Sequence, residues 1–238
     1  MRKRIFSLTI FSIAMGFLEA VVVVYLRQLY YPEGFVFPLK PMVLEGFYIE
    51  SLREVSTLIM LVSLGVAAGR ILSERLAYIL YCFGFWDIFY YGWLKVLLDW
   101  PQSFLTWDIL FLIPVVWAGP VLAPITCAFT MVAIAGCILY FHDKRRATKI
   151  SPPEWAVLSL GGLVIFFSFI WEYTKMMIQG GFISRFLSLG TDLQFQKAIA
   201  QHIPDSYNWY LFALGEGMIL CFLVMFYRRA SSNIKPYL

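Results

Sequence analysis

Four carboxylates stand inside long apolar stretches of this chain: Glu19, Asp87, Glu172 and Glu216, each in a different stretch. A charged side chain near the centre of a bilayer costs about 2.5–3.5 kcal/mol on insertion scales, and intramembrane acids generally face a bundle interior or a water-filled cavity. We therefore expect these residues to mark the functional region. Such carboxylates can hold a proton or a cation, but alone they specify neither a reaction nor a substrate.

The densest group of polar and aromatic side chains is WDIFYYGWLK at residues 86–95. On a helix, Asp87, Tyr91 and Lys95 fan across one face, and Tyr90 belongs to an adjoining aromatic strip. Asp87 and Lys95 are about 12 Å apart along the axis, too far for a direct ion pair. We expect Lys95 to extend toward the membrane interface, whereas Asp87 needs a partner on another helix, a water molecule or a ligand.

A related order of residues, WEYTK, occurs at residues 171–175. Glu172 and Lys175 are three residues apart, close enough to pair on one helix, and Tyr173 lies between them. The shared order of tryptophan, acid, tyrosine and lysine hints at two inverted halves of three helices each, an arrangement common in transporters.

Arg53 and Glu54 open another apolar stretch and share a helical face with Glu50. Together with the residues above, they place five carboxylates and three bases in the outer half of the membrane. These are Glu19, Glu54, Asp87, Glu172 and Glu216, with Arg53, Lys95 and Lys175. Protonation, a bound cation, or a ligand that is cationic or donates protons would meet this excess, and mutual pairing in a static bundle is the alternative. The candidate ligand-binding residues are Glu19, Arg53, Glu54, Asp87, Tyr90, Tyr91, Lys95, Asp108, Glu172, Tyr173, Lys175 and Glu216.

The composition predicts the elements that position these residues. Of the 238 residues, 61% are hydrophobic and 14% are charged, which excludes an ordinary soluble domain. A membrane-spanning helix needs about 20 mainly apolar residues. We expect one all-α domain over residues 1–238, a polytopic bundle of six transmembrane helices at residues 5–26, 52–72, 76–98, 116–141, 155–178 and 209–227.

The distribution of basic residues predicts the orientation, because short cytoplasmic loops are rich in Lys and Arg. With six crossings, twelve of the nineteen basic residues fall on one side, so we expect both termini in the cytoplasm. The longer connections then lie outside, and the net charge of +4 is a topology signal rather than a sign of nucleic-acid binding.

Residues 104–141 are too long for one straight span, at about 57 Å. Pro114, Pro120 and Pro124 interrupt them, and proline breaks or kinks a helix. We expect a short helix that begins at Thr106, with Asp108 in its first turn, and a true span after Pro120. This short helix would be broken or interfacial, either at the outer surface or dipping into the membrane, and a simple kinked helix is the alternative.

No cofactor or metal site is predicted. The histidines, His142 and His202, both fall outside the apolar stretches, which argues against a haem with axial histidines. The four cysteines have no CxxC spacing and suit buried, apolar positions. A bound cation remains one way to meet the negative charge.

The segments WDIFYYGWLK (86–95), LTWDILFLIP (105–114) and GPVLAP (119–124) resemble those of an uncharacterised family of bacterial polytopic integral membrane proteins. The resemblance covers mainly the third and fourth predicted spans. It implies a bacterial inner membrane and several helices, and it brings no activity, cofactor or site residue.

The leading functional hypothesis is a permease-like protein whose outward-facing polar cavity binds an ion or a small solute. One alternative is a membrane-embedded enzyme at the periplasmic leaflet with two carboxylates as general acid and base, although the chain has no GxSxG or HExxH motif. The other is an accessory or assembly subunit, whose charges find partners on another membrane protein. Association with lipid, with a partner subunit or with a second copy is compatible with these hypotheses.

Overall fold

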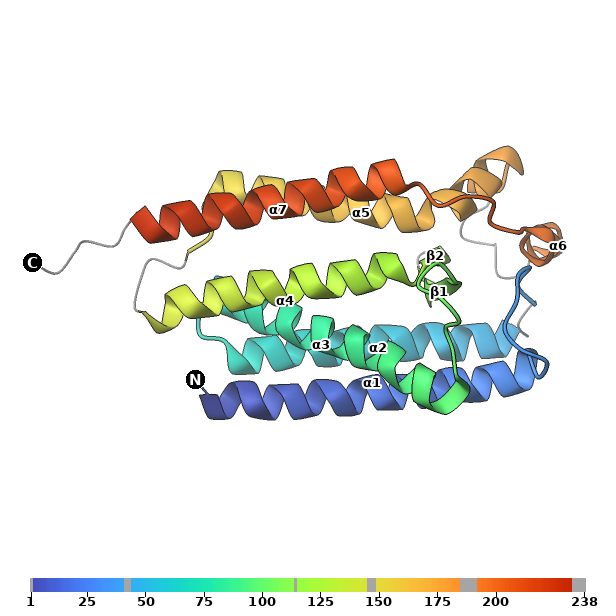
Figure 1. Cartoon of the computed structure of the whole chain (residues 1–238). Coiled ribbons are helices and arrows are strands. Elements are labelled where there is room, and N and C mark those ends of the chain that lie inside the picture. Colours follow the sequence, from blue (N-terminus) through green and yellow to red (C-terminus); the bar gives the residue numbers. More distant parts are fainter. Residues whose placement is uncertain (1, 41–43, 114, 145–148, 185–191, 233–238) are drawn as a thin grey trace, which may run out of the picture.

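The computed structural model describes residues 2–40, 44–113, 115–144, 149–184 and 192–232. Six long helices run back and forth along one axis (Figure 1). They are α1 (Arg2–Tyr30), α2 (Leu44–Ala68), α3 (Leu72–Leu98), α4 (Leu122–Asp143), α5 (Pro152–Gln179) and α7 (Trp209–Ser232). A short helix, α6 (Leu193–Gln201), and a hairpin of β1 (Trp107–Phe111) and β2 (Trp117–Pro120) complete the described part. The start of α1 and the end of α7 lie at one end, and α6 at the other.

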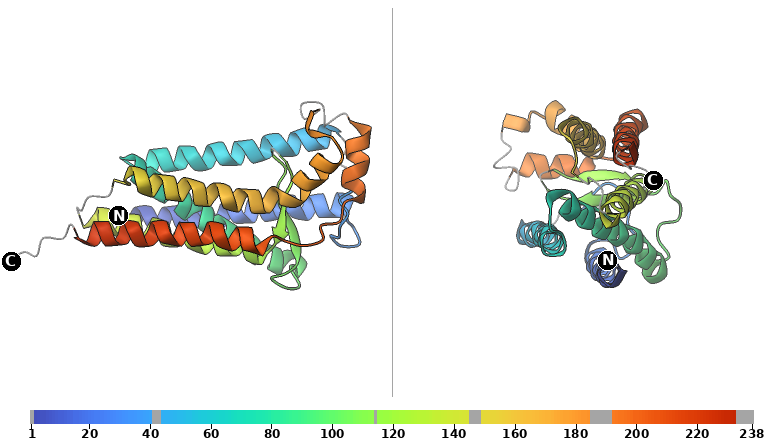
Figure 2. Two further views of the ribbon diagram at one scale, coloured as in Figure 1. Left: turned by 90° about the horizontal axis from the view of Figure 1, so that it is seen from above. Right: turned by 90° about the vertical axis from the view of Figure 1, so that its left-hand side faces the viewer.

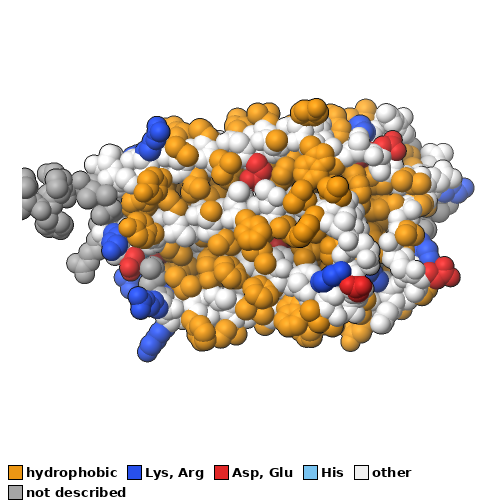
Figure 3. Space-filling view, in the orientation of Figure 1, with side chains coloured by type: hydrophobic (Ala, Val, Ile, Leu, Met, Phe, Trp, Pro, Cys, Tyr) orange, Lys and Arg blue, Asp and Glu red, His pale blue; other side chains and the backbone are white. Residues whose placement is uncertain are grey.

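Five of these helices are long and apolar enough to cross a membrane: α1, α2, α4, α5 and α7. The chain is therefore a multi-pass helical membrane protein. On the face seen in Figure 3 hydrophobic side chains cover the middle of the molecule, and most charged side chains lie toward its two ends.

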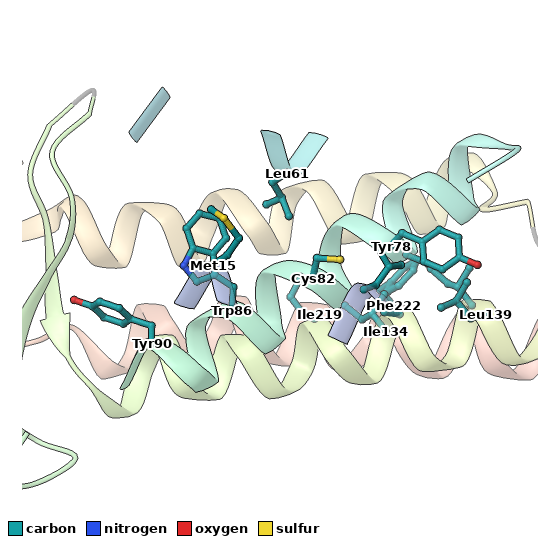
Figure 4. Close-up of a cluster of buried hydrophobic side chains, with 14 of the residues drawn as sticks. Met15, Leu61, Tyr78, Cys82, Trp86, Tyr90, Ile134, Leu139, Ile219 and Phe222 are labelled. Atoms are coloured by element: carbon teal, nitrogen blue, oxygen red, sulfur yellow. The ribbon is translucent and has the colours of Figure 1, made fainter. Parts of the chain in front are cut away.

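One of the six predicted spans, at residues 76–98, is not confirmed. Helix α3 has 27 residues, which is long enough, but it does not meet the hydropathy requirement that the other five meet. The physical reason is its position, since α3 packs against α1, α2 and α4. A helix packed against several others can carry an aspartate at mid-depth, which is costly on a lipid-facing helix. Figure 4 shows side chains of α3, including Tyr78, Cys82 and Trp86, at the centre of the apolar core.

Glycines permit close contact between the helices. A Cβ atom on Gly16 of α1 would lie 2.9 Å from the backbone oxygen of Trp86 in α3, and one on Gly84 would lie 2.6 Å from the backbone oxygen of Ala128 in α4. A Cβ on Gly215 of α7 would lie 3.0 Å from the backbone oxygen of Gly161 in α5. Small residues at such crossings let membrane helices approach through their backbones.

The bundle has two parts, which are visible in the end view of Figure 2. Helices α1 to α4 form one part, and α5 and α7 pack on each other to form the second. Helix α7 meets α4, and α5 meets β2, by smaller contacts. Near the ends of α5 and α7, Arg229 binds the buried carboxylate of Glu154 through two nitrogens, at 2.7 and 2.8 Å. The carboxylate also accepts a hydrogen bond from the backbone N–H of Ser151, which caps α5.

The short helix predicted from Thr106 is wrong: this segment is an antiparallel β-hairpin. Trp107 is opposite Pro120, Asp108 is opposite Gly119, and the register shifts after Ile109. Residues 107–111 and 115–117 are mainly aromatic or β-branched, which favours strands. The prolines exclude a continuous helix, and α4 begins at Leu122, after Pro120 as expected and six residues beyond the first residue of the predicted span 116–141. Pro114, at the predicted break, lies outside the described residues.

Candidate functional site

A cavity of about 830 Å³ runs along the interior of the bundle. All seven described helices and the hairpin contribute to its wall. On α5 alone the lining residues extend from Trp155 to Met177, which corresponds to about 33 Å of helix. The wall is mainly apolar and aromatic, and charged groups gather in one region of it. Such a cavity has the size of a small-molecule site.

The structure brings most of the predicted carboxylates to this one cavity. Among the described residues its wall holds six acids, from α1, α2, α3, β1 and α7, and three bases; these are Glu19, Glu50, Glu54, Asp87, Asp108 and Glu216, with Arg27, Lys40 and Arg53. Three acids are thus in excess over the bases. Of the four carboxylates within apolar stretches, Glu172 alone does not line the cavity.

Arg53 of α2 joins two helices through carboxylates. Its guanidinium lies 2.6 Å from Glu50 on the same helix and 3.4 Å from Glu19 on α1. The side chains are largely buried, so solvent screens these ion pairs only weakly. Arg53 is therefore already shared between two acids before any ligand binds.

Asp87 of α3 lacks such a base. In the described part of the chain its carboxylate makes no hydrogen bond and no ion pair, although it lines the cavity. The charge that acts on it is another acid, Glu19. Asp87 is half-buried, and a carboxylate held away from bulk water requires a proton, a cation or hydrogen-bond donors, so Asp87 can accept a ligand from the cavity.

Glu216 of α7 is only partly satisfied. Thr130 of α4 donates a weak hydrogen bond of 3.4 Å to Oε1, while Oε2 is buried without a hydrogen-bond partner among the described residues. The thiol of Cys127 is close enough to interact with the carboxylate electrostatically. Glu216, Thr130 and Cys127 all line the cavity.

Two further carboxylates hold the hairpin. Both oxygens of Glu54 in α2 accept a hydrogen bond from the backbone N–H of Leu112, each at 3.0 Å. Asp108 of β1 accepts from Arg27 of α1 at 3.4 Å and from the hydroxyl of Tyr91 in α3 at 3.2 Å. Non-helical backbone within a membrane protein needs partners of this kind for its polar groups. The hairpin is therefore tied to three helices by side chains of the cavity wall.

The pKa of Asp108 predicts a pH effect. Burial raises this pKa from 3.8 to about 6, even though Arg27, the backbone N–H of Ile109 and Tyr91 lower it. The folded state then binds the proton more tightly than the unfolded state. The stabilisation that follows is complete below the unfolded pKa and is lost as the pH rises through the folded pKa.

We therefore expect the wild-type protein to lose more thermal stability than Asp108→Asn when the pH rises from about 5 to about 7. Unfolding temperatures in detergent at each pH provide the measurement. Asp99→Asn is the matched control, because the Asp99 side chain is 81% exposed. Identical pH slopes for the wild type and Asp108→Asn would contradict the prediction.

The remaining predicted residues lie in two different surroundings. Lys95 points away from Asp87 and pairs with the exposed Asp99 at 2.7 Å. Glu172 and Lys175 pair on α5 at 2.6 Å, as their spacing predicts. Tyr90, Tyr91 and Tyr173 line the cavity. Lys95, Glu172 and Lys175 do not line it.

Sequence reasoning missed Arg27 as a site residue. It directly follows the first predicted span, and its guanidinium binds Asp108 and lies 3.8 Å from the ring centre of Trp100. Glu50 and Lys40 also line the cavity and were not on the candidate list. No local signal links Arg27 to a partner 81 residues away, and only its place beside an apolar stretch could have drawn attention to it.

Among the described residues, no group of three or more His, Cys, Asp or Glu side chains is arranged to hold a metal ion. The site is thus a set of carboxylates and tyrosines with two arginines and one lysine around one cavity. Comparison of the chain with protein-family models, with curated proteins and with solved structures found no match.

Proposed function

We propose that this protein is a permease-like membrane protein that binds a small organic cation in the cavity. The observation that carries the proposal is the excess of acids in the wall, and above all Asp87, which has neither a base nor a hydrogen-bond donor among the described residues. The two arginines do not relieve it, since Arg53 and Arg27 are committed to other carboxylates. A cationic ligand would provide the missing positive charge.

The size and the aromatic lining support an organic cation rather than a bare ion. A volume of about 830 Å³ is within the range of small-molecule pockets. Tyr90 and Tyr91 stand on the same helix as Asp87, one turn farther on, and also line the cavity. Aromatic faces beside carboxylates are suited to ammonium groups through cation–π attraction.

The hairpin supports a transport role. Non-helical segments at membrane depth are common at transporter binding sites. Here the hairpin depends on Glu54 and Asp108, two carboxylates of the same wall that would meet the ligand. A cation that binds either carboxylate competes with the hydrogen bonds that this carboxylate makes at the hairpin. Ligand binding and the position of the hairpin are therefore coupled.

The orientation is part of the proposal. The basic residues at the ends of the helices gather where α1 begins and α7 ends, and basic residues favour the cytoplasmic side. Both termini then lie on the cytoplasmic side of a bacterial inner membrane. The hairpin and α6, at the other end, face outward, and the cavity receives its ligand from that side or from the bilayer.

Binding of butyltrimethylammonium to the protein in lipid nanodiscs tests the proposal. Trp117 and Trp155 line the cavity, so their fluorescence reports occupancy. We expect saturable binding that Asp87→Asn weakens by about tenfold or more, because the variant removes the unpaired charge. Glu172→Gln is the matched control, since Glu172 is an acid of a long apolar helix that lies outside the cavity wall.

Two results would overturn this binding role: equal affinity of the wild type and Asp87→Asn, or equal binding of butyrate, the anion of the same length. Uptake of radiolabelled butyltrimethylammonium into proteoliposomes tests transport separately. This cation carries a permanent charge and crosses a bare bilayer slowly. Uptake no faster than in protein-free vesicles would remove the permease part of the proposal and leave the binding part.

A further inference from the structure

The cavity extends well beyond its charged region. Helix α3 contributes Leu76, Leu80 and Phe83 to the wall in addition to Asp87. Leu76 precedes Asp87 by eleven residues, which corresponds to about 16 Å along the helix. This distance is half of the hydrocarbon core of a bilayer, which is about 30 Å thick. A compact cation bound at Asp87 would leave this length of the cavity unused.

We call this part of the cavity the tail slot. Its wall is formed on four helices by Leu76, Leu80, Ile134, Leu158, Gly162 and Ile219. All six are apolar or lack a side chain, so the slot offers no partner to a charge or a hydrogen-bond donor. Its surroundings suit a hydrocarbon chain, whereas the region around Asp87, Glu19 and Glu54 suits a polar head.

One side of the cavity wall lacks extensive helix packing. In the described part of the chain, α2 packs extensively on α3 alone, and α5 packs on α7 and β2. Both helices line the cavity, α2 through residues between 47 and 54 beside the charged region, and α5 along the slot as well. Gly162 of α5 lines the slot and is exposed. The boundary between α2 and α5 is therefore a side of the wall that helix packing does not close tightly.

We propose that the ligand is a single-chain amphiphile with a cationic head, which enters from the bilayer between α2 and α5. Its ammonium head binds at Asp87 and Glu19, and its chain fills the tail slot. This inference rests on the proposed function, which provides the cationic head, and adds the chain and the lateral route. It also gives a role to the apolar length of the cavity, for which a small cation has no use.

Gly162 provides a way to block the slot without disturbing the helices. A Cβ atom on Gly162 would meet no atom within 4 Å, so a phenylalanine there can direct its ring into the free space. Gly136 of α4 is the matched control: it is also helical and exposed, a Cβ atom on it would meet no atom within 4 Å, and it does not line the cavity. The variants Gly162→Phe and Gly136→Phe thus differ in where the ring lies.

The experiment uses the protein in nanodiscs with a dodecyltrimethylammonium probe that carries a photoreactive diazirine at the end of its chain. After illumination, mass spectrometry locates and quantifies the labelled peptides. We expect labels on the peptides that contain Ile134 and Leu158, reduced about tenfold by Gly162→Phe and unchanged by Gly136→Phe. Butyltrimethylammonium, which is too short to reach the slot, should bind both variants as it binds the wild type, which also shows that they are folded.

The outcomes separate the two proposals. Equal labelling of wild type and Gly162→Phe, with intact Asp87-dependent binding of butyltrimethylammonium, would overturn the amphiphile and keep the proposed function. Failure of the wild-type protein to bind butyltrimethylammonium would overturn the proposed function. Equal labelling by a dodecanoate probe with the same diazirine would contradict the cationic head. If Gly162→Phe fails to bind the short cation, Leu158→Trp blocks the same slot, and unchanged labelling there would refute the inference.

Discussion

Arg229→Gln should destabilise the protein more than any other substitution considered for this fold. Glu154 is 1% exposed, and Arg229 is its ion-pair partner, with contacts of 2.7 and 2.8 Å. Loss of one member of a buried pair typically costs 3–5 kcal/mol, because the other charge stays behind unpaired. The Arg229 side chain is 33% exposed, so solvent offsets part of the cost of leaving Glu154 unpaired. We expect the free energy of unfolding to fall by about 2 kcal/mol.

The measurement is the thermal unfolding temperature in detergent. Arg228→Gln removes the same charge from the neighbouring exposed position and should change this temperature little. The double variant Glu154→Gln/Arg229→Gln should recover part of the loss, because no charge remains unpaired. Equal effects of the Arg228 and Arg229 substitutions would show that the pair does not hold α5 and α7 together.

Arg53→Gln should increase the affinity of the cavity for butyltrimethylammonium, by roughly tenfold. Arg53 neutralises Glu19 and Glu50, and Glu54 also lies within its electrostatic reach. Removal of the guanidinium leaves these carboxylates without a base, and a ligand cation can take its place. The same change should lower the stability of the empty protein, since like charges then face one another.

Tryptophan fluorescence titration in nanodiscs measures this affinity. Lys95→Gln serves as the control, because Lys95 is a base of the neighbouring α3 that pairs with the exposed Asp99 outside the cavity. An affinity that falls rather than rises would show that the carboxylates freed from Arg53 do not bind the cation, and it would contradict the proposed cation site. The sign of the change therefore tests whether these carboxylates belong to the binding site.

Much of the fold follows from the sequence because a helix that spans a bilayer needs about 20 mainly apolar residues. Five of the six predicted spans are confirmed by helices of sufficient length and hydropathy. Helix α3 is the exception, and its aromatic residues and Asp87 explain both why it falls short and why it lies among other helices. The pairing of Glu172 with Lys175 was predictable from spacing alone.

The hairpin was not predictable in the same way. Prolines in residues 104–124 indicated a break, but a break can become a kink, a short helix or a strand pair. The choice depends on tertiary contacts such as the one between Glu54 and the backbone of Leu112, 58 residues apart. The residues next to Glu54 and Leu112 do not indicate this contact. The sequence therefore predicts the acids of the site but not the residues that bind and position them.

The division of the bundle into two parts has a consequence for biogenesis. The pair α5–α7 has its own glycine contact and its own ion pair, and it is synthesised after α1 to α4. During translation the first four helices can reach the membrane before the last pair arrives. The cavity wall on α1 to α4 then stays open on one side until α5 and α7 dock, so the last step of insertion is the one that encloses the cavity.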